Sequence, residues 1–178
     1  MYLEKLLTEI TQMLDCLKIP YLLTGSLAFN IYSVPRATRD IDLIIEISDN
    51  DSDKLIAAIN GKFYYNAQTI KEEIKRKGMF NIIHLESTYK IDLIVCPDDE
   101  FEAEKFRRRQ PINLFGDEIY VATIEDLTIS KLRWIQQTES ELQKRDIAAL
   151  LSNPNIDIDY VKKWCKKMRL KTFKLIEL

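Results

Sequence analysis

The chain has 178 residues, with 26 Lys and Arg against 28 Asp and Glu, for a formal net charge of −2 at pH 7. This length suffices for one core with a small helical addition, and the acidic balance excludes a protein that coats nucleic acid through its overall charge. Three cysteines without a CxxC pair favour neither a disulfide framework nor a structural zinc site, and no apolar run predicts a signal peptide or membrane contact, so we expect a cytoplasmic protein.

The first part of the chain predicts helices and strands in alternation. Apolar residues at helical spacing indicate an amphipathic helix over 2–18. The short apolar run Tyr21-Leu22-Leu23 predicts a strand, and 27–32 predicts a short helix after it. Residues 40–47 are rich in β-branched side chains that alternate with acids, which predicts the next strand.

The rest of the chain predicts further strands and then helices alone. The expected elements are helices 51–60 and 67–77, strands 79–86 and 90–96, helix 99–109, a hairpin over 111–121, and helices 124–137, 139–151 and 157–169. This order predicts an α/β (α+β) fold, a mixed β-sheet flanked by helices. Residues 1–122 would form its core, and 123–178 a helical C-terminal segment packed on that core.

Gly25 and Ser26 stand between a predicted strand and a predicted helix. Backbone N–H groups at a helix N-terminus point at anions, and the helix dipole favours negative charge there. A serine that only caps its helix explains the same dipeptide. Taken alone, the pair leaves phosphate binding and capping both open.

Three aspartates provide a second signal. Asp40 and Asp42 lie two residues apart on a predicted strand, so both project from one face, within reach of one hard cation. Adjacent carboxylates repel each other without such a cation, which favours Mg²⁺ or Mn²⁺ over a solvated strand edge. Asp92 is flanked by apolar residues in a later strand, where an unpaired charge is costly, and it is expected to face the same metal.

An apolar strand, Gly-Ser, a short helix, Asp-x-Asp and a third aspartate on a later strand together resemble the nucleotidyltransferase superfamily that includes DNA polymerase beta. The run 35–42 is similar to its abortive-infection toxin branch of the AbiE type, and the resemblance covers residues 20–96. Segments 127–132 and 144–150 are similar, more loosely, to the lysine and Asp-x-x-x-Leu segments of that branch's helical part.

The resemblance implies transfer of a nucleoside monophosphate from a nucleoside triphosphate, ATP among the candidates, to a hydroxyl. Asp40 and Asp42 would hold two metal ions. Asp92 would either ligate the acceptor-side metal or accept the hydroxyl proton directly, and of these two roles we favour that of a metal ligand. Gly25 and Ser26 would then bind the triphosphate.

Further candidates for contact with the nucleotide come from cationic residues and one more acid. Arg36, Arg39 and Lys131 would neutralise phosphate charge, although each is equally well explained as a solvated surface residue. Asp146 resembles the family's helical acid, with a solvent-facing residue or a member of a helical ion pair as its alternative.

The acceptor is less constrained by sequence. Our leading hypothesis is a toxin-type enzyme that modifies RNA or a partner protein and is neutralised by a cognate antitoxin. Two clusters of basic residues are expected either to contact RNA or to form solvated helix faces: Arg107–Arg109, and Lys162, Lys163, Lys166, Lys167, Arg169 and Lys171. The alternatives are an antibiotic-modifying nucleotidyltransferase and a nucleotide-binding or interaction module without turnover.

Overall fold

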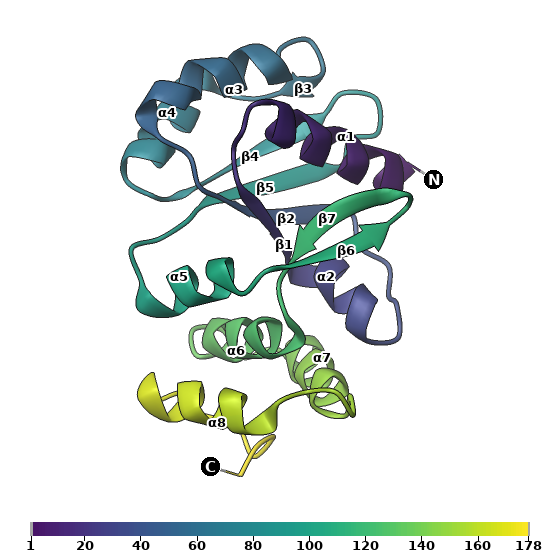
Figure 1. Cartoon of the computed structure of the whole chain (residues 1–178), viewed down its shortest axis with the longest axis vertical. Helices are drawn as coiled ribbons and strands as arrows, with labels where there is room; N and C mark the ends of the chain where they lie inside the picture. Colours follow the sequence, from purple (N-terminus) through teal and green to yellow (C-terminus); the bar gives the residue numbers. More distant parts are fainter. Residues whose placement is uncertain (1, 178) are drawn as a thin grey trace.

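One seven-stranded mixed sheet organises this computed structural model, which describes residues 2–177 (Figure 1). The strands are β1 Tyr21–Thr24, β2 Asp40–Ile45, β3 Phe63–Tyr64, β4 Met79–His84, β5 Lys90–Val95, β6 Gln110–Leu114 and β7 Asp117–Val121, in the order β3-β4-β5-β2-β1-β7-β6. The helices are α1 Tyr2–Cys16, α2 Gly25–Tyr32, α3 Ser52–Ile59, α4 Ala67–Lys75, α5 Glu100–Arg107, α6 Ile124–Ile135, α7 Glu141–Leu151 and α8 Ile158–Lys167, with a 3₁₀ turn at Asp49–Asp51. The predicted mixed sheet flanked by helices is confirmed.

The element order follows the sequence analysis closely, with one addition. β3 is a two-residue strand that pairs with the end of β4. Two residues are too few to show a period-2 pattern, so only their neighbour in space identifies them as a strand. None of the helices described here has the length and apolar character needed to cross a membrane.

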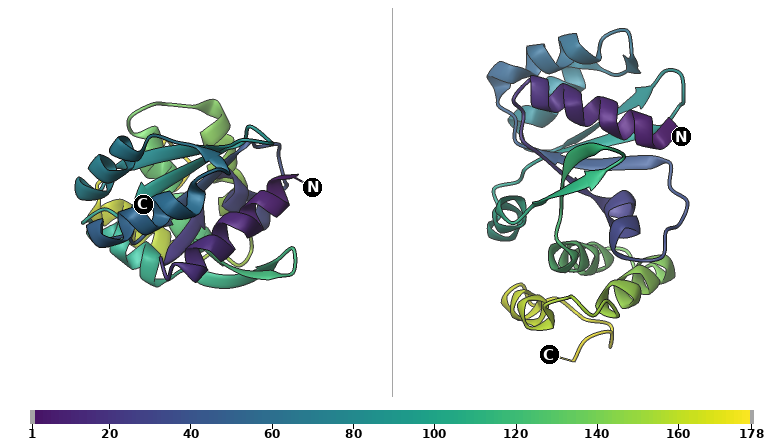
Figure 2. Two further views of the ribbon diagram at one scale, coloured as in Figure 1. Left: turned by 90° about the horizontal axis from the view of Figure 1, so that it is seen from above. Right: turned by 45° about the vertical axis from the view of Figure 1, so that its right-hand side comes forward.

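The sheet separates two layers of helices (Figures 1 and 2). α1, α3 and α4 lie on one side, and α2, α5, α6 and α7 lie on the other. The central strand β2 pairs in parallel with β5 and antiparallel with β1. Its residues Ile41, Leu43 and Ile45 are fully buried in the main core, so the side chains that alternate with them face the second layer.

The C-terminal helices form a second apolar cluster, which α5 joins through Phe101. α6 lies between the sheet and α8 in both side views (Figures 1 and 2). Ile124 and Leu127, at the start of α6, belong to the main core instead, so this helix joins the two apolar clusters.

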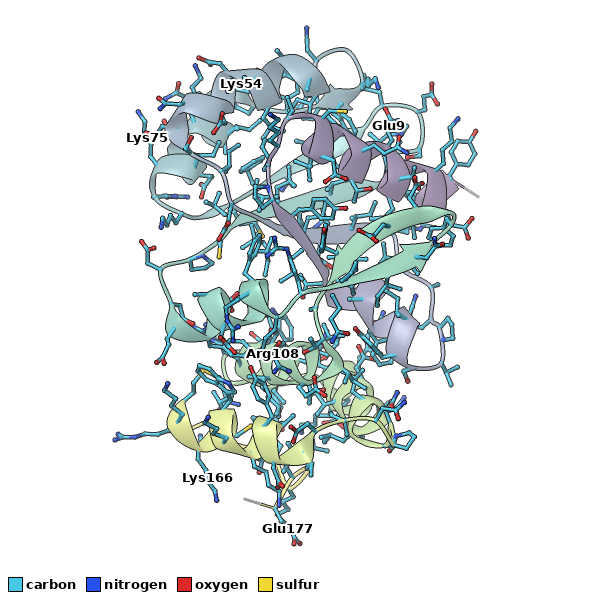
Figure 3. The ribbon with its side chains drawn as sticks, viewed as in Figure 1. Glu9, Lys54, Lys75, Arg108, Lys166 and Glu177 are labelled. Atoms are coloured by element: carbon cyan, nitrogen blue, oxygen red, sulfur yellow. The ribbon has the colours of Figure 1, made fainter. Side chains whose placement is uncertain are left out.

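A buried ionic cluster ties α8 to the rest of the molecule. Asp126 is fully buried and accepts hydrogen bonds from Arg108 Nε (3.0 Å), Tyr160 Oη (2.9 Å) and Thr123 Oγ1 (2.9 Å). The Arg108 guanidinium also lies 3.9 Å from the ring centroid of Tyr160. Arg108 therefore points into the helical layer, whereas Lys166 points outward from α8 (Figure 3).

The substitution Tyr160→Phe should destabilise the protein, because it removes one of the hydrogen bonds that a fully buried carboxylate requires. We expect a loss of about 1–3 kcal/mol in the free energy of unfolding, measured by urea denaturation. Tyr64→Phe is the matched control, since Tyr64 is 69% exposed. Equal stabilities of the two variants would contradict a structural role for the Tyr160 hydroxyl.

Candidate functional site

The site begins where β1 passes into α2. Gly25 has φ +66°, and a Cβ built on it would overlap the carboxylate of Asp42 on the neighbouring strand. The backbone N–H of Ser26 donates to that same carboxylate. Glycine is therefore required at this turn for two reasons, the left-handed backbone and the close approach of Asp42. One of the N–H groups that the sequence assigns to phosphate here serves an acid of the protein itself.

The register between β2 and β5 places the three predicted acids side by side. Asp42 pairs with Asp92, and Asp40 pairs with Lys90. Lys90 Nζ lies 2.6 Å from Asp92 Oδ2, whereas Asp92 Oδ1 is buried without a hydrogen-bond partner. Burial, followed by the charges of Asp92 and Asp40, raises the pKa of Asp42 to about 6.

A network of charges, buried at Asp146 and Lys131 and partly exposed at Arg36, lies beside Ser26. Arg36 Nη2 donates to Ser26 Oγ (2.8 Å) and to Asp146 Oδ2 (2.9 Å), and Arg36 Nε donates to Asp146 Oδ1 (3.2 Å). Lys131 Nζ donates to Asp146 Oδ2 (2.8 Å) and to Gln143 Oε1 (2.9 Å). Burial opposes ionisation of Asp146, but hydrogen bonds from Arg36 and Lys131 outweigh it and hold the pKa of this carboxyl below its ordinary value.

Local contacts fix the two cations of this network. The Asn30 side chain donates to the Arg36 carbonyl (2.8 Å) and accepts from the Arg36 N–H (3.0 Å), which holds the loop after α2. Both Arg36 and Lys131 lie over the ring of Phe29, 5.7 and 5.4 Å from its centroid. Burial lowers the pKa of Lys131, despite its hydrogen bond to Asp146. Nothing in the sequence pattern pointed to Asn30 or Phe29, which stand within a predicted helix.

A cavity of about 500 Å³ opens over these groups. Asp40, Asp42 and Ser26 line one part of it, and α6 contributes a row of residues spaced along one helical face. The lining consists of Thr24, Gly25, Ser26, Asp40, Asp42, Ile44, Ile94, Pro97, Glu102, Lys105, Leu127, Ser130, Lys131, Trp134 and Gln143. The sequence predicted three carboxylates around one cleft; two of them line it, and Asp92 lies beside Asp42 in the sheet.

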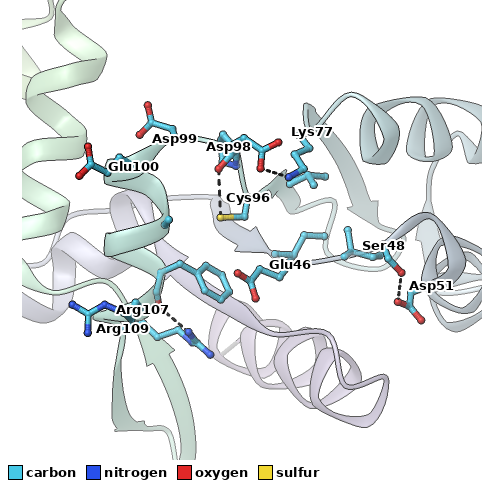
Figure 4. A pocket seen from close by; sticks show the side chains of 16 residues that line it. Glu46, Ser48, Asp51, Lys77, Cys96, Asp98, Asp99, Glu100, Arg107 and Arg109 are labelled. Atoms are coloured by element: carbon cyan, nitrogen blue, oxygen red, sulfur yellow. Dashed lines mark hydrogen bonds and ion pairs between the residues drawn. The ribbon is translucent and has the colours of Figure 1, made fainter. Parts of the chain in front are cut away.

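A larger cavity, of about 950 Å³, lies at the carboxyl ends of β2 and β5 (Figure 4). Among the residues that the structure describes, Pro97 alone lines both this cavity and the one over the acids. Lys77 and Asp98 pair with each other in the lining of the larger cavity, whereas Arg107 pairs with Glu104 and Glu100 pairs with Lys167, both outside it. None of the predicted site residues is among the described residues that line this larger cavity. The smaller cavity is therefore the candidate site.

The other predicted cations lie elsewhere. Arg39 is exposed and is not among the described residues that line the cavity. Arg107 pairs with Glu104 (2.7 Å), and Arg109 donates to the Phe106 carbonyl (2.7 Å). Arg108 is partly buried against Asp126, whereas the Arg107 side chain is exposed, and RNA contact by these arginines stays a prediction. The helix that carries Lys162, Lys163, Lys166 and Lys167, α8, lies on the far side of α6 from the sheet (Figure 1), and none of these lysines is among the described residues that line the cavity.

The residues fit a divalent cation, although they do not form a finished site for one. Within residues 2–177, no three acidic, histidine or cysteine side chains are grouped as metal ligands. Asp40 and Asp42 nevertheless present carboxylate oxygens from one strand face, which Mg²⁺ and Mn²⁺ prefer. The buried, unpartnered Asp92 Oδ1 adds an oxygen that lacks a donor. At present the Lys90 ammonium balances this charge.

No protein-family model matches the chain, and no curated protein matches it. Its fold does match solved structures. The lincosamide antibiotic adenylyltransferase LnuA, lincomycin-bound, has a TM-score of 0.54 at 15% identity over 83% of this chain and 96% of that one. The antibiotic-resistance factor ANT(2'')-Ia gives 0.62 at 11% identity over 94% and 91%. An antigenic nucleotidyltransferase-like protein from Paracoccidioides brasiliensis gives 0.55 at 19% identity over 94% and 88%.

These likenesses show that the chain has a nucleotidyltransferase-like fold. At this level of identity they show the fold alone. The resemblance that the sequence analysis reported is confirmed to that extent, and the similarity to the AbiE branch stays a prediction.

Gly25→Ala should destabilise the protein more than Gly61→Ala. Both glycines have positive φ, but only at Gly25 would a Cβ meet Asp42, since nothing lies within 4 Å of a Cβ at Gly61. The backbone strain common to both is about 1–2 kcal/mol, and we expect thermal unfolding to reveal an additional loss at Gly25. That additional loss should shrink in an Asp42→Ala background. Equal effects of the two alanines would contradict the packing argument.

Asp42→Asn should stabilise the metal-free protein at neutral pH. A folded-state pKa of about 6, raised from 3.8, means that the native state loses stability as pH rises through this window. Above pH 6 the ionised Asp42 lowers the free energy of unfolding by on the order of 2 kcal/mol, after allowance for its partial exposure. Thermal unfolding in EDTA should show the advantage of Asp42→Asn at pH 7.5 and its disappearance below pH 4. Asp53→Asn, on the exposed side of α3, is the control.

Proposed function

We propose that this chain is a metal-dependent nucleotidyltransferase that moves a nucleoside monophosphate from a nucleoside triphosphate to a hydroxyl and releases pyrophosphate. The observation that carries the proposal is that Asp40 and Asp42 line the same cavity as Ser26 and Lys131. Ligands for a hard cation thus face donors suited to phosphate across one space of nucleotide size. The likeness of the fold to nucleotidyltransferases supports the same reaction class.

In this proposal Asp40, Asp42 and Asp92 hold the metal. A bound Mg²⁺ or Mn²⁺ would supply Lewis-acid stabilisation of phosphoryl oxygens. The residues of the chain orient the reactants around it. Asp92 stands next to Asp42 on the inner strand β5, which suits a ligand on the acceptor side.

Lys131 is the first phosphate contact in the proposal. Its ammonium has three N–H donors, of which two are used by Asp146 and Gln143, so one remains for a ligand in the cavity. Asp146 is 3% exposed, which makes it a positioning residue that holds Arg36 and Lys131 rather than a contact of the nucleotide. Ser26 Oγ and the α2 N-terminus complete the triphosphate end.

The acceptor is the finer part of the proposal. A toxin that modifies RNA or a partner protein, countered by an antitoxin, stays our first hypothesis. A small hydroxyl compound of the antibiotic type is the second candidate, and a specific observation favours it. Lys105 and Lys131 are the cations among the described lining residues, and both are paired with internal acids, which leaves little free positive charge for a polyanion.

Asp40→Asn and Asp42→Asn should each reduce transfer more than about 100-fold, since even partners outside the ligand sphere of a metal often contribute 10- to 100-fold. The assay incubates purified protein with Mg²⁺ or Mn²⁺ and each labelled nucleoside triphosphate, against total RNA, candidate proteins, and lincosamide and aminoglycoside antibiotics. Asp53→Asn should retain wild-type transfer.

The same assay contains the results that would contradict the proposal. Transfer that survives both substitutions would remove the aspartates from the chemistry. Nucleotide binding without transfer to any acceptor would favour the binding module without turnover. Labelled antibiotic with unlabelled RNA and protein would decide between the two acceptor classes.

A further inference from the structure

One face of α6 forms a wall of the cavity over the acids. Leu127, Ser130, Lys131 and Trp134 are separated by three, four and seven positions, the spacing of a single helical face, and all four line the cavity. α6 is otherwise mostly buried, yet Trp134 is 52% exposed. A single exposed aromatic residue needs no special explanation, but this one lines the same space as the acids.

The sheet contributes apolar side chains to the lining of the same cavity. Ile44 follows Asp42 on the same face of β2, and Ile94 follows Asp92 on β5. Both line the cavity together with Pro97. A flat apolar group placed between these side chains and the Trp134 indole would lose water on both of its faces.

Three hydrogen-bonded polar side chains also line the cavity. Lys105 is 3% exposed; its Nζ donates to Ser130 Oγ (3.1 Å) and lies 2.6 Å from Glu102 Oε2. All three residues line the cavity. Glu102 offers a hydrogen-bond acceptor, Lys105 a donor, and Ser130 either. Such a set can pair with the donors and acceptors along the edge of a nucleobase.

The two ends of the cavity therefore differ in chemistry. Lys131 lies at the phosphate end of the proposed site, and Trp134 follows it by three residues, a rise of about 4.5 Å along the helix. A nucleotide that places its phosphates at Lys131 and Ser26 thus extends its base toward the indole. The volume of about 500 Å³ lies in the range of small-molecule sites.

We infer that Trp134 is the stacking platform for the base of the donor nucleotide, with Lys105, Ser130 and Glu102 facing the edge of that base. This inference rests on the proposed function and adds the base subsite to it. Because a two-ring purine overlaps an indole more than a pyrimidine does, ATP and GTP should bind more tightly than CTP and UTP.

The test compares two ligands that share the phosphate end. Calorimetry with Mg²⁺ would measure binding of an ATP analogue with a non-cleavable α–β bond and of inorganic tripolyphosphate. Trp134→Ala should weaken the analogue roughly 5- to 100-fold, the range for loss of one base-aromatic stack, and leave tripolyphosphate unchanged. Trp134→Phe should recover part of the affinity. Phe115→Ala, which truncates a similarly exposed aromatic outside the cavity, should change neither ligand.

Fluorescence provides an independent readout. The chain has two tryptophans, and Trp164 is buried against Phe101 in the second apolar cluster. The ATP analogue should quench the emission of the wild type, and Trp134→Phe should abolish this quenching. Unaltered far-UV circular dichroism and melting of the variants would exclude a folding defect.

Failure of the base subsite and failure of the proposed function give different results. Equal affinity of Trp134→Ala and wild type for the ATP analogue, without quenching, would overturn the base subsite while leaving transfer chemistry at Asp40 and Asp42 intact. A raised KM for the acceptor at unchanged affinity for the analogue would also overturn it and assign the indole to the acceptor. A wild type that binds neither ligand would overturn the proposed function itself.

Discussion

The contact between Asp42 and Gly25 is the constraint around which the site is built. Asp42 stands on the central strand, beside Asp92 on one neighbour and opposite Thr24 on the other. Its carboxylate occupies the space that a side chain at position 25 would take. The contact therefore fixes the start of α2 relative to the pair Asp42 and Asp92, and with it the position of the cavity above them.

The acid side and the cation side of the site are stabilised by different means. Asp42 has a raised pKa, since burial and its acidic neighbours all oppose its charge. Arg36, Lys131 and Asp146 balance one another through short hydrogen bonds, and two of them pack on Phe29. The result is a cavity with one end short of positive charge and another where cations are already in position. Such an asymmetry suits a ligand that arrives with both a metal ion and phosphates.

The C-terminal helices supply part of this site as well as a second apolar cluster. Lys131 and Trp134 come from α6, and Asp146 and Gln143 come from α7. The buried pairing of Arg108 with Asp126 and its stacking on Tyr160 hold these helices against α5 and α8. Of the arginines that the sequence offered for RNA, Arg108 thereby helps to orient the helices behind the cavity.

The sequence by itself predicted the mixed sheet, the order of the elements other than β3, and the three acids as candidates, because hydrophobic periodicity and the Gly-Ser and Asp-x-Asp spacings are local properties of the chain. It also identified Arg36, Lys131 and Asp146, but as separate residues with solvated alternatives. Tertiary structure decided that these three form one network, that Lys90 balances Asp92, and that Arg39 lies outside the cavity. These outcomes depend on strand register and on which face of α6 meets the sheet, and no periodicity along a single chain specifies how distant segments align.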